Sequence, residues 1–199
     1  MYEKINELEK KVKNLEEIIN LKIKDKKDII LFEKSTIIKN DYERKMLENF
    51  IKENDKTKKE IFPNLLFKAS VNGDEAEDFH KKCDYMGATL TIVLSENGRR
   101  FGGYTSSSWD KSGNWVTDGV NILFSLDARK FYINTSGNYH TYHHSSYGPT
   151  FGGGHDLYIK SGCLNNKGSY TNKSSYGMSS SHELNGGEKN FKVLDYEVF

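Results

Sequence analysis

The sequence contains the stretch Gly148-Pro149-Thr150-Phe151-Gly152-Gly153-Gly154-His155-Asp156-Leu157, in which a large aromatic residue precedes three adjacent glycines. A counterpart, Phe101-Gly102-Gly103-Tyr104, also places a large aromatic residue before adjacent glycines, in sequence that otherwise favours strand. Glycine loses the most backbone entropy on folding, so within a strand it marks a bulge, a bend or a close approach of another backbone. We therefore predict a bent core strand, with the glycines allowing close packing and Phe151 turned into the core.

A phosphate-binding loop is the alternative for the same glycine run. Such loops continue into Gly-Lys-Ser/Thr, or stand between a strand and a helix as GxGxxG. Neither context surrounds this run, so the bent strand is the preferred interpretation.

Composition restricts the class of protein. The 199 residues include 29 basic and 28 acidic side chains, and this balance argues against a nucleic-acid binder, which usually shows a basic face. No run of about 18 apolar residues occurs, so no membrane span is expected. The N-terminus is charged at once and lacks an apolar signal core. We expect a cytoplasmic or nuclear protein whose two cysteines, Cys83 and Cys163, are reduced thiols.

The chain divides by composition into two parts. All 17 glycines and all six histidines lie at Gly73 or later, whereas the first third is rich in Lys, Glu, Ile, Leu and Asn. This change separates helical sequence from sheet and loop sequence. The predicted organisation is a coiled-coil helix with a charged connector over residues 1–34, followed by one domain over residues 35–199.

The N-terminal helix, from Met1 to about Lys24, carries a heptad repeat. Its apolar residues are spaced three, four, three and four apart, and they are Ile5, Leu8, Val12, Leu15 and Ile19. The next position of the repeat is Lys22, where the seam weakens. A helix this short is marginal alone in water, so self-association is expected. The alternative is a solvated amphipathic helix that frays.

Two further helices are expected before the strands begin. The first spans Asp41–Lys52, with Asp41 as its N-cap. The second spans Asp74 to about Met86, because Ala76, Phe79, Cys83 and Met86 line one stripe and acidic residues occupy its first turn. Cys83 on this stripe is typical of a small buried hydrophobic residue rather than a nucleophile.

After residue 88 the apolar period changes to two, which indicates strands. The expected strands cover residues 89–94, 99–105, 120–126, 130–133, 156–160 and 191–199. Asn97-Gly98 predicts a hairpin turn between the first two. Residues 163–187 are polar and predict a long loop with short strands. Many short strands at this spacing favour a β-sandwich over a parallel sheet.

Several side chains are candidates for chemistry. His140, His143 and His144 are the most suggestive metal ligands, but no cysteine or carboxylate stands at ligand spacing nearby. His155 with Asp156, and His80 with Asp84, could form acid–base pairs or simply make local hydrogen bonds. No G-x-S-x-G elbow occurs.

Trp109 and Trp115 lie in a Gly/Ser-rich loop. They form either an exposed recognition patch or a lid on the sandwich, and the sequence does not favour one over the other.

The chain from about Ser35 to Phe199 resembles a TLDc domain, the module of the oxidation-resistance proteins. The matching segments, whose order and spacing carry the resemblance, are Leu65–Ser70, Asp78–Asp84, Gly87–Ile92, Phe101–Ser106 with Trp109, Phe124–Leu126, Gly148–Leu157 and Glu197–Phe199. Ala88 departs from the proline that the family often has there. The heptads lie outside the resemblance.

The resemblance implies an α+β fold in which helices flank a sandwich of two antiparallel sheets. It implies a cytosolic interaction module in oxidative-stress protection that binds the peripheral stalk of the vacuolar proton-pumping ATPase and regulates the pump. It brings no catalytic residue and no cofactor. The candidate partner contacts are His80, Asp84, Trp109, His155 and Asp156. The alternatives are a stress-related enzyme using Cys83 or a His/Asp pair, and an oligomeric or transcription-linked scaffold.

Overall fold

The computed structural model describes the backbone of residues 2–25, 31–58 and 60–199, and the side chains of residues 4–16, 31–58 and 60–199. The chain forms two compact units, Met1–Ile30 and Leu31–Phe199. The second unit begins four residues before the expected boundary at Ser35, because Phe32 is buried edge-on against Phe199 with the ring centroids 5.2 Å apart.

The first unit is the single helix α1 (Tyr2–Asp25), in the place that the heptads predict. Its described apolar side chains are exposed, from 46% at Ile5 to 57% at Leu8 and Leu15. Its pairing with another chain stays a prediction, and the side chain of Ile19 lies outside the described residues. Within the described parts of the chain, no helix is long and apolar enough to cross a membrane.

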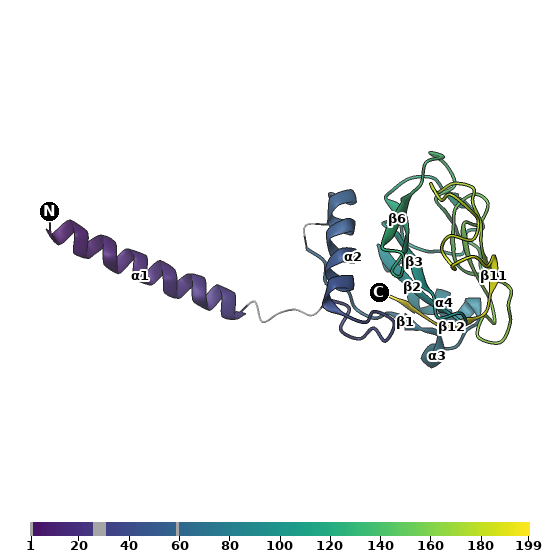
Figure 1. The fold of residues 1–199 in the computed structure, drawn as a ribbon, viewed down its shortest axis with the longest axis horizontal. Helices are drawn as coiled ribbons and strands as arrows, with labels where there is room; N and C mark the ends of the chain where they lie inside the picture. Colours follow the sequence, from purple (N-terminus) through teal and green to yellow (C-terminus); the bar gives the residue numbers. More distant parts are fainter. Residues whose placement is uncertain (1, 26–30, 59) are drawn as a thin grey trace. The chain divides into compact units, whose positions relative to one another are not determined.

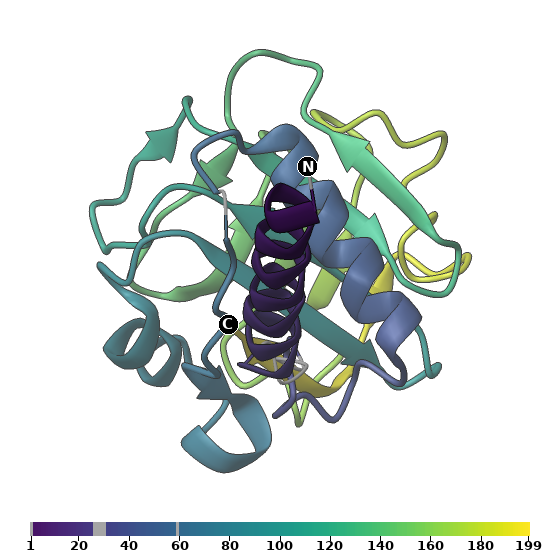
Figure 2. The ribbon, with the colours of Figure 1, turned by 90° about the vertical axis from the view of Figure 1, so that its left-hand side faces the viewer.

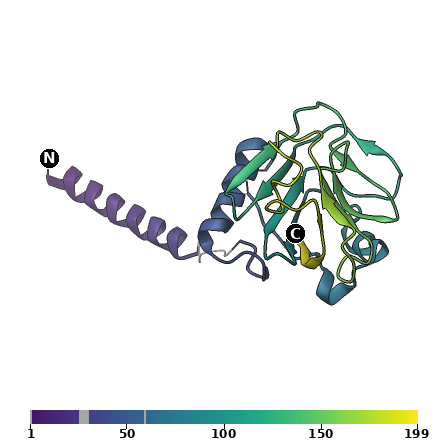
Figure 3. The same ribbon diagram turned by 45° about the vertical axis from the view of Figure 1, so that its right-hand side comes forward.

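The second unit contains two six-stranded antiparallel sheets, which confirms the predicted α+β sandwich. The first sheet has the order β1 (Phe67–Lys68), β12 (Val193–Val198), β2 (Thr89–Ser95), β3 (Arg100–Thr105), β5 (Asn121–Ser125), β6 (Lys130–Ile133). The second has the order β11 (Asn190–Phe191), β10 (Ser169–Thr171), β9 (Leu157–Lys160), β8 (Tyr147–Phe151), β7 (Thr141–Tyr142), β4 (Trp115–Val116). Figures 1 and 3 show the strands of this unit from two sides.

The central strands of the first sheet are buried on both faces. Along β2, Leu90 and Ile92 face helix α2 (Asp41–Asn54), which lies across the outer side of this sheet (Figure 2). Val93 faces the opposite way, into the core that the two sheets share. Two hydrophobic layers therefore cover the first sheet, and its strands are apolar on both sides.

Helix α2 begins one residue earlier than a cap at Asp41 would allow. The N-cap is Asn40, whose Oδ1 accepts the backbone N–H of Glu43 at 3.0 Å, so the predicted Asp41 cap is wrong. Asp41 is the first helical residue and pairs with Arg44. Glu43 itself reaches into the protein, where Arg100 Nη1 donates to it at 2.8 Å.

Arg100 fixes α2 to the first sheet. Its guanidinium is buried and donates to Glu43 on one side and, through Nε and Nη2, to Asp127 Oδ1 at 3.0 and 2.7 Å on the other. A buried charge is tolerated when it is paired in this way, and removing one partner would leave the other uncompensated.

A buried carboxylate holds the last strand. Glu197 on β12 is fully buried and accepts from Thr36 N–H at 2.8 Å and Lys68 Nζ at 3.2 Å, with Ser35 Oγ as a third donor. This set of donors fastens the segment before α2 to β12 and to β1.

The helix expected over Asp74–Met86 is shorter than predicted. A short helix α3 (Ala69–Asn72) precedes it, and α4 itself spans Ala76–Cys83. Its end is set by Tyr85, which takes a left-handed φ of 61° and donates its N–H to Trp109 O at 3.0 Å. Phe79 and Cys83 face the core as predicted, whereas Met86 is 53% exposed.

The two aromatic–glycine motifs meet across the sandwich. Phe151 at the end of β8 is fully buried, as predicted. Its ring lies on the backbone of Gly103 in β3, where a Cβ atom would stand 2.6 Å from Phe151 Cζ. Real side chains do not approach this closely, so the contact requires glycine at position 103. The spacing between the sheets here is set by one aromatic ring on bare backbone.

The three glycines after Phe151 do not form a bent strand, and that prediction is wrong for them. Gly152 begins the turn between β8 and β9 with φ +84°, which favours glycine. The strand irregularity lies earlier, between Tyr147 and Thr150. The N–H groups of Gly152 and Gly153 bind His140 O and Ser175 Oγ, so they are not free to cradle a phosphate.

Gly103→Ala should destabilise the folded unit by about 1–3 kcal/mol, because the added methyl group overpacks against Phe151. Phe151→Leu should make the same substitution less costly, since the smaller side chain leaves room for the methyl. Urea unfolding of the two single variants and the double variant gives the coupling energy.

The matched control is Gly177→Ala, where a Cβ would find its nearest neighbour at 3.7 Å and no left-handed φ is involved. This change should alter the free energy of unfolding by no more than about 0.5 kcal/mol. Equal losses for Gly103→Ala and Gly177→Ala would show that the contact between ring and backbone does not limit packing.

Candidate functional site

Eight rings collect on the outer side of the second sheet, and we call this surface the aromatic face. Its members are Trp115, Tyr139, Tyr142, His144, Tyr147, His155, Tyr158 and Tyr170. Tyr139 is 49% exposed and the other seven are half-buried. None of the eight belongs to either hydrophobic core cluster.

Strand alternation and register place these rings together. On β9, Leu157 and Ile159 point into the core, so Tyr158 between them points outward. Tyr158 stands opposite Tyr170 of β10 in the register, with ring centroids 5.1 Å apart. Trp115 of β4 stands opposite Tyr142 of β7 in the same way, at 4.6 Å.

His155 is the centre of the aromatic face. Its ring centroid lies 5.6–6.3 Å from those of five neighbours, which are Trp115, Tyr142, Tyr147, Tyr158 and Tyr170. The turn that begins at Gly152 positions His155 on this face. His155 ends the turn with a left-handed φ of 54°, and its N–H donates to Gly152 O. Its Nδ1 lies 3.0 Å from Tyr170 Oη.

The aromatic face carries little charge at its centre. Burial lowers the pKa of His155 although Asp156 opposes this effect, so the imidazole is neutral near pH 7. Burial also raises the pKa of Tyr158 to about 12, which keeps its phenol protonated. Lysines stand at the edge: Lys160 is opposite Tyr147 in the register, and Lys189 Nζ lies 5.7 Å from the centroid of Tyr170.

This arrangement is suited to binding. Tyr and Trp offer a large apolar body with a polar tip and lose little entropy on contact, which is why they are enriched at interfaces. Each ring is supported by its neighbours, so the surface is organised before a partner arrives. A weakly charged aromatic centre with charged side chains at its rim is the usual anatomy of a protein interface.

His80 and Asp84, predicted as a possible acid–base pair, make contacts that stabilise the fold. His80 on α4 is 3% exposed, and its Nδ1 lies 2.7 Å from Asp84 Oδ1. Its Nε2 donates towards the backbone oxygens of His144 and Tyr147, at 3.0 and 3.1 Å. The imidazole therefore connects α4 to the start of β8 and has no open side for a substrate or partner.

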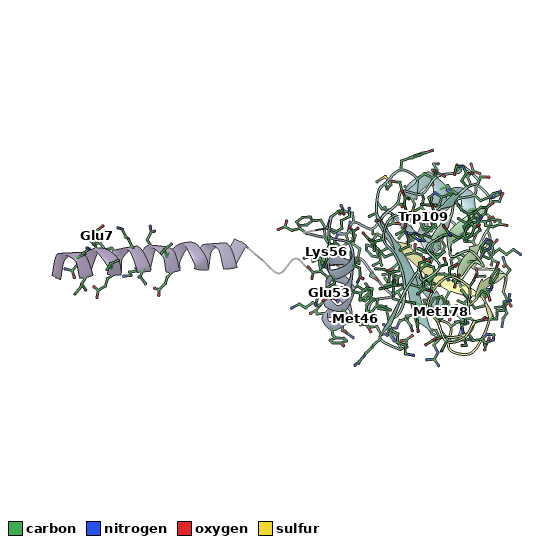
Figure 4. All side chains as sticks on the ribbon, turned by 90° about the horizontal axis from the view of Figure 1, so that it is seen from above. Glu7, Met46, Glu53, Lys56, Trp109 and Met178 are labelled. Atoms are coloured by element: carbon green, nitrogen blue, oxygen red, sulfur yellow. The ribbon has the colours of Figure 1, made fainter. Side chains whose placement is uncertain are left out.

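Trp109 and Asp156 are also buried and make hydrogen bonds inside the domain. Trp109, labelled in Figure 4, is 1% exposed, and its indole N–H donates to Thr89 Oγ1 at 2.8 Å. Asp156 is fully buried and accepts the N–H groups of three successive residues, Ser174, Ser175 and Tyr176. Of the five candidate partner contacts, only His155 lies on the aromatic face.

The three histidines expected as metal candidates have separate surroundings. His143 is buried beside Trp109, and its Nδ1 lies 3.3 Å from Asp110. His140 contacts Asn121, and His144 stacks on Tyr142 in the aromatic face. Among the described residues, no group of three His, Cys, Asp or Glu side chains is placed to hold a metal ion.

Both cysteines are buried and free. Burial raises the pKa of Cys83 well above that of an ordinary thiol, and it raises the pKa of Cys163 to about 12. A thiol attacks as its thiolate, so neither residue has the environment of a nucleophile or a redox sensor.

A second surface feature is a groove of about 300 Å³ between the segment after α2 and residues of the central strands β2 and β3 of the first sheet. Phe62 and Met86 at its rim are 64% and 53% exposed, and Phe199 lines its floor. Lys58, Glu60 and Tyr104 also line the groove, together with the apolar side chains Ile51, Ile61 and Leu90.

Sequence reasoning singled out three members of the aromatic face, Trp115, His144 and His155, and missed the row of tyrosines. The available signal was a tyrosine at an outward position in each of several short strands. Recognising it required the strand register, because Tyr158 and Tyr170 are neighbours only once β9 and β10 are paired.

A family model described as "TLDc domain" matches residues 31–199. The match covers the whole second unit and leaves α1 outside. No curated protein was found to match the chain.

The lowered pKa of His155 should make the free energy of unfolding depend on pH. Its folded pKa lies below the unfolded value of about 6.5, and burial lowers the pKa of His143 as well. The unfolded chain therefore takes up more protons as pH falls, and the stability present above about pH 6.5 should decrease towards the folded pKa values. His155→Gln should reduce this slope.

NMR titration of the histidine rings checks the lowered pKa of His155. Urea unfolding between about pH 7.5 and pH 5.5 checks the loss of stability as pH falls. An imidazole of His155 that titrates above its unfolded value would contradict the neutral centre of the aromatic face.

Proposed function

The chain belongs to the TLDc domain family, and from that premise we propose that it is a non-enzymatic binding module that contributes to protection from oxidative stress. The TLDc domain fits an oxidative-stress-related protein-interaction module. The observation that carries the proposal is the aromatic face, which gives such a module a preorganised surface for a partner.

The chemistry of the described residues supports the non-enzymatic part. The thiol of Cys83, the best nucleophile candidate, is buried with a raised pKa. Both ring nitrogens of His80 are occupied by contacts within the fold, with Asp84 and with the backbone oxygen of His144. Asp156 is buried away from the aromatic face, where it accepts backbone N–H groups. The alternative of a stress-related enzyme therefore has no supporting arrangement among these side chains.

The partner we propose is the vacuolar proton-pumping ATPase, bound through its peripheral stalk in the cytoplasm. The support for this choice is the family membership. The aromatic face adds the expected chemistry of the contact: apolar side chains of the partner against the rings, and carboxylates opposite Lys160 and Lys189.

The role of the surface is tested by Trp115→Ala and Tyr142→Ala. Interface anchors of this kind cost about 2 kcal/mol or more when truncated, so each variant should bind the partner at least about tenfold more weakly. Tyr42→Ala is the matched control, because Tyr42 is 59% exposed on α2 and lies off the aromatic face.

The measurement is capture of pump subunits from lysate by the tagged full chain, followed by titration with the isolated stalk. Circular dichroism and urea unfolding establish that each variant is folded. Undiminished capture by folded Trp115→Ala and Tyr142→Ala would remove the aromatic face as the binding surface. Failure of the unmodified chain to capture any pump subunit would remove the pump as partner.

Thiol titration tests the enzymatic alternative. In the folded protein both cysteines should react slowly with a thiol reagent, because each is buried with a raised pKa. In denaturant both should react at once. Rapid reaction of Cys83 under native conditions would restore it as a candidate nucleophile.

A further inference from the structure

Helix α1 has an apolar seam with no covering side chain in the described residues. Ile5, Leu8, Val12 and Leu15 are 46%, 57%, 53% and 57% exposed. Beside the seam, Glu7 and Lys11 form an i, i+4 ion pair within the helix, at 2.7 Å (Glu7 is labelled in Figure 4). A helix of this length is marginal in water unless its apolar side is buried.

The residue types in the seam favour a particular number of helices in a coiled coil. In the heptad notation abcdefg, Ile5 and Val12 occupy a positions, and Leu8 and Leu15 occupy d positions. β-Branched residues at a with leucine at d favour two-stranded parallel coiled coils over trimers and tetramers. No polar residue interrupts positions 5–15 of the seam.

The flanking charges select the orientation. The g positions are Lys4 and Lys11, and the e positions are Glu9 and Glu16. In a parallel pair each g residue faces the e residue of the following heptad on the other helix, so Lys4 meets Glu9 and Lys11 meets Glu16. In an antiparallel pair g faces g and e faces e, which sets lysine against lysine and glutamate against glutamate. Such flanking charges set the orientation of coiled coils.

We propose that the seam of α1 binds α1 of a second copy of the chain, in a parallel, in-register, two-stranded coiled coil. The second units of both chains then follow the same end of the helix pair. A partner with repeated sites meets two linked aromatic faces, and the second contact is formed at a high effective concentration. This inference is independent of which partner the aromatic face binds.

The oligomeric state of the full chain tests the stoichiometry. Sedimentation equilibrium over a dilution series should give twice the mass of one chain at the concentrated end. Val12→Asp places a carboxylate in the seam and should abolish the dimer, whereas Lys10→Asp, on the opposite side of the helix, should leave it intact. A monomer throughout the series, or a trimer or tetramer, would overturn the proposal.

Disulfide trapping tests the orientation, and the native cysteines do not interfere because both are buried. In mild oxidant, Leu8→Cys should cross-link to itself, since equivalent d positions face each other only in a parallel, in-register pair. Lys10→Cys should not cross-link. Preferential linkage of Leu8→Cys to Val12→Cys in a mixture of the two variants would show an antiparallel pair and contradict the proposal.

Discussion

The Phe151 ring packs directly on the backbone of Gly103, and this contact limits how the two sheets pack against each other. It joins a strand of one sheet to a strand of the other with no side chain in between. Trp109 packs edge-on against Phe151 at 5.5 Å, and Phe79 of α4 packs against Trp109 at 5.6 Å. Phe151, Trp109 and Phe79 therefore form a row of aromatic contacts that runs from the backbone of Gly103 to α4, with Trp109 in the middle.

The same ten-residue stretch has a second consequence, on the outside of the molecule. Directly after Phe151, the turn that Gly152 begins reverses the chain, and His155 emerges at the centre of the aromatic face. Asp156, the next residue, turns inward and binds the backbone of residues 174–176. One short segment thus spaces the sheets through Phe151, places His155 in the aromatic face and fastens the neighbouring loop through Asp156. Gly152 takes a φ of +84°, and at Gly154 a Cβ would stand 2.6 Å from Ser174 Cβ, so both positions favour glycine despite its entropic cost.

The sequence predicted those features whose signals are local. Alternation predicted strands such as β2, and the aromatic–glycine motif predicted that Phe151 faces the core. Asn40 was missed as the cap because asparagine and aspartate are equally good caps, so residue preference does not separate Asn40 from Asp41. The end of α4 was missed because it depends on the contact of Tyr85 N–H with Trp109 O. The tyrosines of the aromatic face were missed because several of the strands that carry its rings are too short to show a period: Trp115 and Tyr142 pair across strands of two residues each.

We propose that the aromatic face is the surface through which this module binds its partner. Covalent footprinting of the full chain, free and in complex with the captured partner, tests it most directly, because it reports every exposed side chain at once. Modification of Trp115, Tyr142, Tyr158 and Tyr170 should fall on binding, while Phe62 and Met86, at the rim of the groove, should react as before. Protection of Phe62 and Met86 with unchanged labelling of the aromatic face would contradict this proposal.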